Sequence, residues 1–179
     1  MKNNVVARCL LVLTVALSFN SGFAQPEKSV ARSGGAPATE AEKGLLAAHD
    51  QFYTALNAMF TGDHAPMNAI WAHRDEVTTM GPFGGRMTGW KAVGEEFKKV
   101  AEMKIGGHVG YKDLVLQVAG DMGYTVCVEH GENKSTDGKP ITVSHRATNI
   151  FRLIDGQWKM VHHHTDLAPQ LDAAVGAKK

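Results

Sequence analysis

The chain has 179 residues, a formal charge of +1 at neutral pH and 44% hydrophobic residues, which suits one ordinary domain with its own core. Its lysines and arginines form no cluster or stripe, so the sequence lacks the electrostatic footprint of a nucleic-acid-binding protein. We therefore expect small molecules or another protein subunit as partners, and no nucleic acid.

The first 24 residues have the three-part pattern of a secretory signal peptide. Lys2 and Arg8 precede an apolar run over residues 9–19, and small residues lie just before Gln25. This run is about half the length of the roughly 20 apolar residues that a membrane span needs. We expect cleavage after Ala24, a periplasmic or secreted location, and no membrane attachment after cleavage.

Cys127 is the one cysteine that remains after this cleavage, because Cys9 lies in the signal segment. A single cysteine cannot form an intrachain disulfide, so the stability of the domain must come from a packed core. Cys127 lies in an alternating strand pattern, which predicts a small buried side chain more than a reactive thiol.

Composition divides the rest of the chain into three parts. Residues 25–39 are rich in proline, glycine and serine and are expected to form a flexible linker. Residues 169–179 are rich in alanine, glycine and lysine and are expected to form a disordered tail. Residues 40–168 are left as the folded domain.

The first half of this domain has helical periodicity. Thr39 and Glu42 have the spacing of a capping box, and apolar residues at helical spacing continue to Phe60, before the helix-ending pair Gly62-Asp63. The later elements expected in this half are a short helix over 65–72, a strand over 76–80, a loop over 81–85 and a third helix over 88–103.

The second half changes to the period-two alternation of strands. The predicted strands cover residues 108–118, 122–132, 141–154 and 157–167. Asp155-Gly156, between the last two, is a strong signal for a two-residue hairpin turn. Helices followed by an antiparallel sheet predict an α+β fold.

The Asp155-Gly156 turn also predicts which side chains share a sheet face. Counting back from it without interruption places one polar set beyond the apolar end of a single face, where it is expected to line a cavity. This set comprises His145, Asn149, His162, His164 and Asp166. His163 then falls on the opposite face, as a surface or interface residue. A β-bulge would shift this assignment.

Several stretches, taken in order, resemble SnoaL-like domains of the nuclear transport factor two-like (ketosteroid isomerase-like) superfamily. They are Phe52-Tyr53-Thr54-Ala55-Leu56 with Gly62-Asp63, then His145-Arg146-Ala147-Thr148, then Asp155 to His164. The last stretch also resembles the association domain of calmodulin-dependent protein kinase. The resemblance implies a cone of three N-terminal helices packed on a curved, mostly antiparallel sheet that encloses a pocket, commonly as a homodimer.

Two departures from the superfamily argue against steroid isomerisation. The isomerase carries its base in an Asp-Pro-Phe-Gly type loop, and the matching stretch here begins with Gly81. An isomerase also needs an oxyanion hole that includes a tyrosine. Ala55 stands at the matched position, and Tyr53 is two residues away on a different helix face.

Other acid–base chemistry remains open. His162 and His164 are imidazoles, whose ordinary pKa near neutrality suits proton transfer. The resemblance to SnoaL-type cyclases implies a pocket carboxylate, for which Asp166 or Glu129 is available. The catalytic candidates are therefore His162, His164 and Asp166, and the binding candidates are His145, Asn149, Glu129, Tyr53, Trp71 and Phe83. In the competing interpretation, these histidines are hydrogen-bonding residues around a structural cavity.

The pair His162 and His164 also has the His-x-His spacing found at zinc sites on strands, where His145 or Asp166 would complete the ligands. Three adjacent histidines are not a closed ligand pattern, however, and the family that the chain resembles usually works without metal. No metal or cofactor is expected.

The leading hypothesis is an exported small-molecule-binding pocket protein of SnoaL-like type, with lyase, isomerase or cyclase chemistry on a carbonyl compound. The alternative is a non-catalytic dimerisation or ligand-binding accessory module. The sequence leaves open whether the protein is an enzyme.

Overall fold

The computed structural model describes residues 30–31, 37–82, 84–135 and 137–167. The predicted signal peptide (1–24), most of the predicted linker (25–39), the predicted tail (169–179) and Phe83 therefore lie outside the described residues. Within the predicted linker, Val30–Ala31 forms the short strand β1, which pairs in parallel with β4. No helix in the described part of the chain has the length and hydropathy needed to cross a membrane.

Helix α1 spans Glu40–Phe60 and begins with the expected capping box. The Thr39 hydroxyl accepts a hydrogen bond from the Glu42 amide at 3.2 Å, and the Glu42 carboxylate accepts one from the Thr39 amide at 2.7 Å. The side chain of each residue thus accepts a hydrogen bond from the backbone amide of the other, so two backbone donors at the exposed start of the helix are satisfied. The helix ends at the C-cap Thr61, next to Gly62 with φ of 110°.

The other two helices are shorter than α1. Helix α2 is a single turn over Met67–Ile70, because Trp71 turns to extended backbone and forms a β-bridge with Met160. Helix α3 spans Trp90–Met103. It starts two residues later than expected because Met87–Thr88 forms the short strand β3 beside β2, which spans Thr78–Met80.

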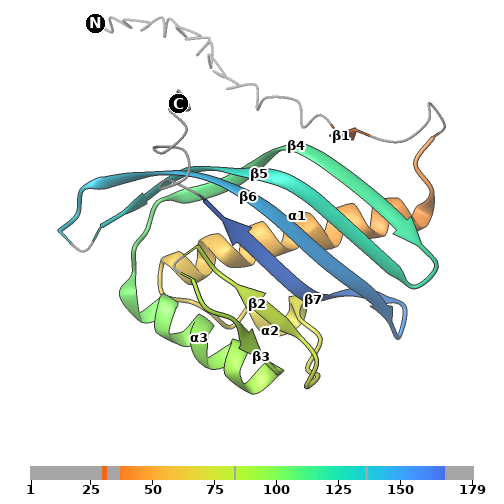
Figure 1. The fold of residues 1–179 in the computed structure, drawn as a ribbon, viewed down its shortest axis with the longest axis horizontal. Coiled ribbons are helices and arrows are strands. Elements are labelled where there is room, and N and C mark those ends of the chain that lie inside the picture. The colour runs from red at the N-terminus through yellow and green to blue at the C-terminus, as the bar shows by residue number, and fades with distance from the viewer. Residues whose placement is uncertain (1–29, 32–36, 83, 136, 168–179) are drawn as a thin grey trace, which may run out of the picture.

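The described strands form one seven-stranded sheet in the order β1-β4-β5-β6-β7-β2-β3. Its four long strands are antiparallel neighbours, namely β4 (His108–Ala119), β5 (Met122–Lys134), β6 (Pro140–Ile154) and β7 (Gln157–Asp166). Figure 1 shows these strands curving over α1, with α2 and α3 beside β2 and β3. The predicted α+β cone of helices on a curved, mostly antiparallel sheet is confirmed.

The core lies between α1 and the concave face of the sheet. Leu45, Phe52 and Met59 of α1 are at most 3% exposed, and Leu116 and Phe151 face them from the sheet. Burying each such side chain contributes about 1.5–3 kcal/mol, which fixes α1 across the sheet. This packing decides which strand residues face inward.

The predicted uninterrupted register of the last hairpin is wrong. Phe151 pairs with Met160, as counting from the turn predicts, but Ile150 pairs with His162. Val161 is therefore an extra residue in β7, a β-bulge that shifts every later residue to the other face. His163 lies inside the cone and is 7% exposed, whereas His162 and His164 lie on the outer, convex side of the sheet.

Candidate functional site

Polar side chains gather around Glu129 on the concave face of the sheet. Glu129 comes from β5, whose inward positions alternate as Thr125, Cys127 and Glu129, and it is 3% exposed. One carboxylate oxygen, Oε1, accepts a hydrogen bond from the Tyr53 hydroxyl at 3.1 Å. The other, Oε2, accepts one from the Thr165 hydroxyl at 3.1 Å. Both oxygens of this buried acid are thus satisfied.

Two imidazoles complete the surroundings of this carboxylate. His145 of β6 places its Nδ1 3.7 Å from Glu129 Oε2, within ion-pair reach but too long for a hydrogen bond. His163 of β7 is the other imidazole. Burial by itself raises the pKa of Glu129, but His145, His163 and the two hydroxyl donors together lower it below its usual value. The carboxylate is therefore ionised at neutral pH.

Tyr53 connects α1 to this cluster. Burial, followed by the charge of Glu129, raises the pKa of Tyr53 well above its usual value. The phenol therefore keeps its proton and donates a hydrogen bond to the carboxylate. The Cys127 thiol lies 3.3 Å from the Tyr53 oxygen. Burial raises the pKa of Cys127 to about 11, so it is a thiol and not a nucleophilic thiolate at neutral pH.

A second chain of hydrogen bonds extends from His163. Its Nδ1 lies 2.6 Å from the Asn149 side-chain oxygen, the Asn149 amide donates to the Thr125 hydroxyl at 3.2 Å, and that hydroxyl lies 3.0 Å from Nδ1 of His49. Burial lowers the pKa of His163 despite the opposing pull of Glu129. His163 is therefore neutral at neutral pH, and its Nδ1–H is the donor to Asn149.

The cluster unites four of the predicted binding residues: Tyr53, Glu129, His145 and Asn149. It leaves out the three predicted catalytic residues, because the bulge turns them outward. The His162 Nδ1 forms a hydrogen bond with the Thr78 hydroxyl at 2.7 Å, and the ring of His164 meets that of His162 edge to face. Asp166 forms an ion pair with Arg146 at 2.8 Å.

Trp71 is 1% exposed and packs against Phe97 of α3, with ring centroids 5.5 Å apart. It belongs to the helical part of the core and not to the polar cluster. Phe83, the other predicted aromatic binding residue, lies outside the described residues.

Sequence reasoning missed His49, Thr125, His163 and Thr165. Two of them carried a usable signal. His49 is four residues before Tyr53 and so shares its helix face, and Thr125 alternates with Glu129 on one strand face. His163 and Thr165 carried none, because they follow the bulge.

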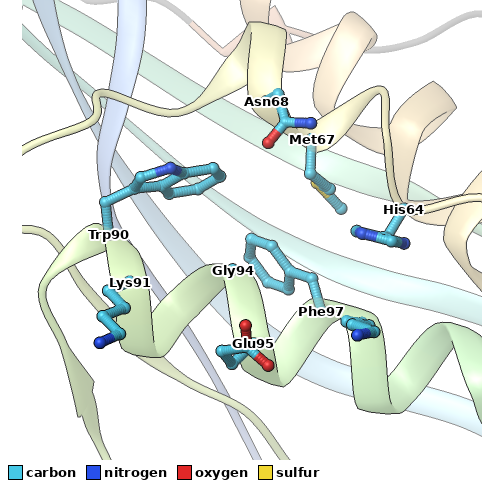
Figure 2. Close-up of a pocket in the computed structure, with 9 residues that line it drawn as sticks. His64, Met67, Asn68, Trp90, Lys91, Gly94, Glu95 and Phe97 are labelled. Atoms are coloured by element: carbon cyan, nitrogen blue, oxygen red, sulfur yellow. The ribbon is translucent and has the colours of Figure 1, made fainter.

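Described residues also line two surface hollows. One, of about 380 Å³, lies between α2 and α3 (Figure 2). The other, of about 620 Å³, lies on the convex side of the sheet beside Thr78, Ile150 and His162. Nowhere in the described part of the chain do three or more His, Cys, Asp or Glu side chains form a group that could hold a metal ion.

The profile of the SnoaL-like domain family matches residues 45–168. The chain belongs to the SnoaL-like domain family. No curated protein matches its sequence.

Several solved structures share the fold of this SnoaL-like domain. A candidate dehydratase of the NTF2-like family from Streptomyces avermitilis has a TM-score of 0.63 at 21% identity, covering 72% of this chain and 96% of its own. A candidate calcium/calmodulin-dependent protein kinase type II association domain from Thiobacillus denitrificans has 0.57 at 25%, covering 69% and 94%. A candidate ketosteroid isomerase from Shewanella frigidimarina has 0.54 at 19%, covering 66% and 91%.

Proposed function

We propose that this SnoaL-like domain is exported and binds a small carbonyl compound on the concave side of its sheet, where His145 and Glu129 provide acid–base chemistry. Export rests on the pattern of the first 24 residues. The observation that carries the chemistry is the pairing of a buried, ionised carboxylate with a partly exposed imidazole 3.7 Å away.

His145 is the proposed catalytic residue of the pair. Its side chain is 14% exposed, against 4% for Glu129, so it is the group that a bound molecule can touch. In the proposed step, His145 removes a proton from the carbon next to the carbonyl of the ligand. The electron pair of the broken C–H bond moves to the carbonyl oxygen as an enolate. Return of the proton to another atom completes an isomerisation, and departure of a leaving group completes an elimination.

Glu129 is a positioning residue in this proposal. Its negative charge stabilises the imidazolium that His145 becomes when it takes the proton. Hydrogen bonds from Tyr53 and Thr165 hold the carboxylate in place before the ligand arrives. The loop that matches the base-carrying loop of the isomerase begins here with Gly81 and has no carboxylate at that position. In the proposed site the carboxylate comes instead from Glu129, on strand β5.

Native mass spectrometry of residues 25–179, purified gently from the compartment of the cell that holds the protein, tests the binding part of this proposal. The wild-type protein is expected to carry a small molecule that denaturation releases. Glu129→Gln is expected to lose it while keeping its circular dichroism spectrum, because the amide preserves the shape but not the charge.

His130→Gln is the matched control, because His130 is the next residue of β5 and lies exposed on the opposite face. It should keep the bound mass. Retention of the same mass by a folded Glu129→Gln protein would show that the molecule binds elsewhere.

A second candidate function is a non-catalytic dimerisation module. The observation that favours it is an exposed apolar face on the convex side of the sheet, where Met122, Tyr124 and Val126 of β5 are each 40–42% exposed. A candidate kinase association domain also shares the fold. In this alternative the polar cluster only supports the structure, and a second copy of the chain covers the convex face.

A further inference from the structure

The groove between α2 and α3 is built from apolar side chains at its base. Met67 of α2 is fully buried and Phe97 of α3 is 7% exposed, and Trp90 lies at one end. Figure 2 shows Trp90 and Phe97 on α3 facing Met67 and Asn68 on α2 across the hollow. None of the lining residues belongs to the Glu129 cluster, so the groove is a separate feature of the molecule.

Trp90 is held in place before any ligand arrives. The imidazole of His73 stacks on the indole with ring centroids 4.3 Å apart and an interplanar angle of 9°. The His73 Nε2 in turn lies 3.0 Å from the carbonyl oxygen of Asn68. The Trp90 amide also donates to the carbonyl of Arg74 at 3.0 Å. The aromatic wall of the groove is thus preorganised, which reduces the entropy that a flat ligand would lose on binding there.

Gly94 forms part of the groove floor, in the interior of α3. A glycine inside a helix is unfavourable relative to alanine, so it needs a reason. The packing supplies none, because a Cβ at position 94 would meet only the Trp90 ring, at an ordinary 3.8 Å. The missing side chain instead keeps open the space beside the indole, where a ligand would lie.

The rim of the groove carries charged side chains of both signs, with one more cation than anion among its lysines and glutamate. Lys91 and Lys98 extend from α3 on either side of Glu95. Within the described residues neither lysine forms an ion pair. The ion pair on this helix joins two other residues, Lys99 and Glu96. Two ammonium groups and one carboxylate give these side chains a net positive charge beside an aromatic base, which is complementary to a molecule that combines a flat apolar body with a negative charge.

We propose that the α2–α3 groove is a binding site for a small planar aromatic anion, with the ring against Trp90 and Phe97 and the acid group beside Lys91 or Lys98. The site is independent of the proposed acid–base function, because it shares no residue with the Glu129 cluster. Its chemistry fits aromatic sulfonates and carboxylates.

Fluorescence titration of the mature chain with 8-anilinonaphthalene-1-sulfonate tests this proposal, with 1-naphthoate as competitor. We expect saturable binding that 1-naphthoate reverses and that weakens at least about threefold in Lys91→Gln/Lys98→Gln. Gly94→Leu should remove it, because the larger side chain fills the space beside Trp90.

Gly94→Ala separates binding from folding. It should weaken binding about three- to tenfold while raising the melting temperature by about 2–4 °C, because alanine stabilises the helix interior. A glycine kept for structural reasons would give the opposite change in melting temperature.

Tyr124→Ser is the control for dye binding to the exposed apolar face of the sheet, and it should leave the titration unchanged. Three results would overturn the proposal: no saturable binding, binding that survives in folded Gly94→Leu, or binding that is lost in Tyr124→Ser.

Discussion

His163 is an imidazole almost without contact with solvent, and the interior favours its neutral form. Burial lowers its pKa in the folded protein, whereas in the unfolded chain the value is about 6.5. Above pH 6.5 both states are neutral, so the folded state has no penalty. As the pH falls below 6.5, the unfolded chain takes up a proton that the folded protein resists, and stability decreases.

Replacing His163 with asparagine should therefore flatten the loss of stability in mild acid. Asparagine keeps an N–H donor near the Asn149 oxygen but does not titrate. Between pH 6.5 and 5.5, the wild-type free energy of unfolding should fall by about 1 kcal/mol more than that of His163→Asn. Urea unfolding at pH 7.5, 6.5 and 5.5 measures this difference.

The exposed His130→Asn variant is the control for His163→Asn, and its pH dependence should follow the wild type. Parallel curves for His163→Asn and the wild type would show that His163 is not the group responsible. Protonation of Glu129 also lowers the free energy of unfolding as the pH falls, because the pKa of Glu129 is lowered in the folded protein. This loss occurs at a lower pH than that of His163, below the ordinary glutamate pKa of about 4.3.

At the scale of elements, one extra residue in β7 decides which histidine belongs to the cluster. Val161 lies between Met160, which pairs with Phe151, and His162, which pairs with Ile150. If Val161 instead paired with Ile150 in an unbroken register, His162 and His164 would turn inward and Thr165 outward. Glu129 would lose the Thr165 hydroxyl, and Asn149 would lose its 2.6 Å contact with His163.

Insertion of one alanine between His162 and His163 should accordingly cost more than about 4 kcal/mol, because it turns His163 and Thr165 away from the buried polar network and shifts the parallel pairing of β7 with β2. Val161→Ala keeps the bulge and should cost only about 1 kcal/mol. Thermal unfolding of both variants measures the two costs. An insertion variant as stable as Val161→Ala would mean that β7 accepts either register.

Much of the fold was predictable because local signals agreed with the packing. The Thr39–Glu42 capping box and the Asp155-Gly156 turn are each set by a few neighbouring residues, and both are confirmed. The bulge was not predictable, since three consecutive histidines give the same alternation in either register. The two-residue strand β3 was missed because so short a segment has no periodicity.

The site was predictable only in part, for the same reason. Glu129 and Tyr53 lie before the bulge on regular elements, so their inward positions follow from periodicity. Predictions for His162, His164 and Asp166 depended on an unbroken register. The inward turn of His163 follows from tertiary packing, which no local pattern contains.

On the scale of the whole molecule, the convex side of the sheet exposes apolar side chains among the residues that the structure describes. The exposed apolar side chains on it include Val115, Met122, Tyr124 and Val126. The ion pairs Arg152–Asp121 and Arg146–Asp166 contribute polar groups to the sheet surface. An apolar centre with polar groups around it is the composition of a homodimer interface.

The proposed homodimer predicts that Tyr124→Glu separates the subunits. A carboxylate in the centre of an apolar contact has no partner, so dimer dissociation should become at least about tenfold easier. Sedimentation of the wild type and the variant measures the change, and Ala92→Glu on exposed α3 is the charge-matched control. A wild-type monomer at 100 μM concentration, or a Tyr124→Glu dimer as tight as the wild type, would contradict it.

Exchange of α-protons for deuterium in cyclohexanone and cyclohexenone, followed by NMR in deuterated water, tests the proposed chemistry most directly. The wild-type protein should accelerate exchange, and His145→Gln should lower the rate at least about 100-fold, as expected for loss of a general base. Glu129→Gln should lower it as well, and His130→Gln should not. Equal exchange rates for wild type, His145→Gln and Glu129→Gln, all folded, would contradict the assignment of this site.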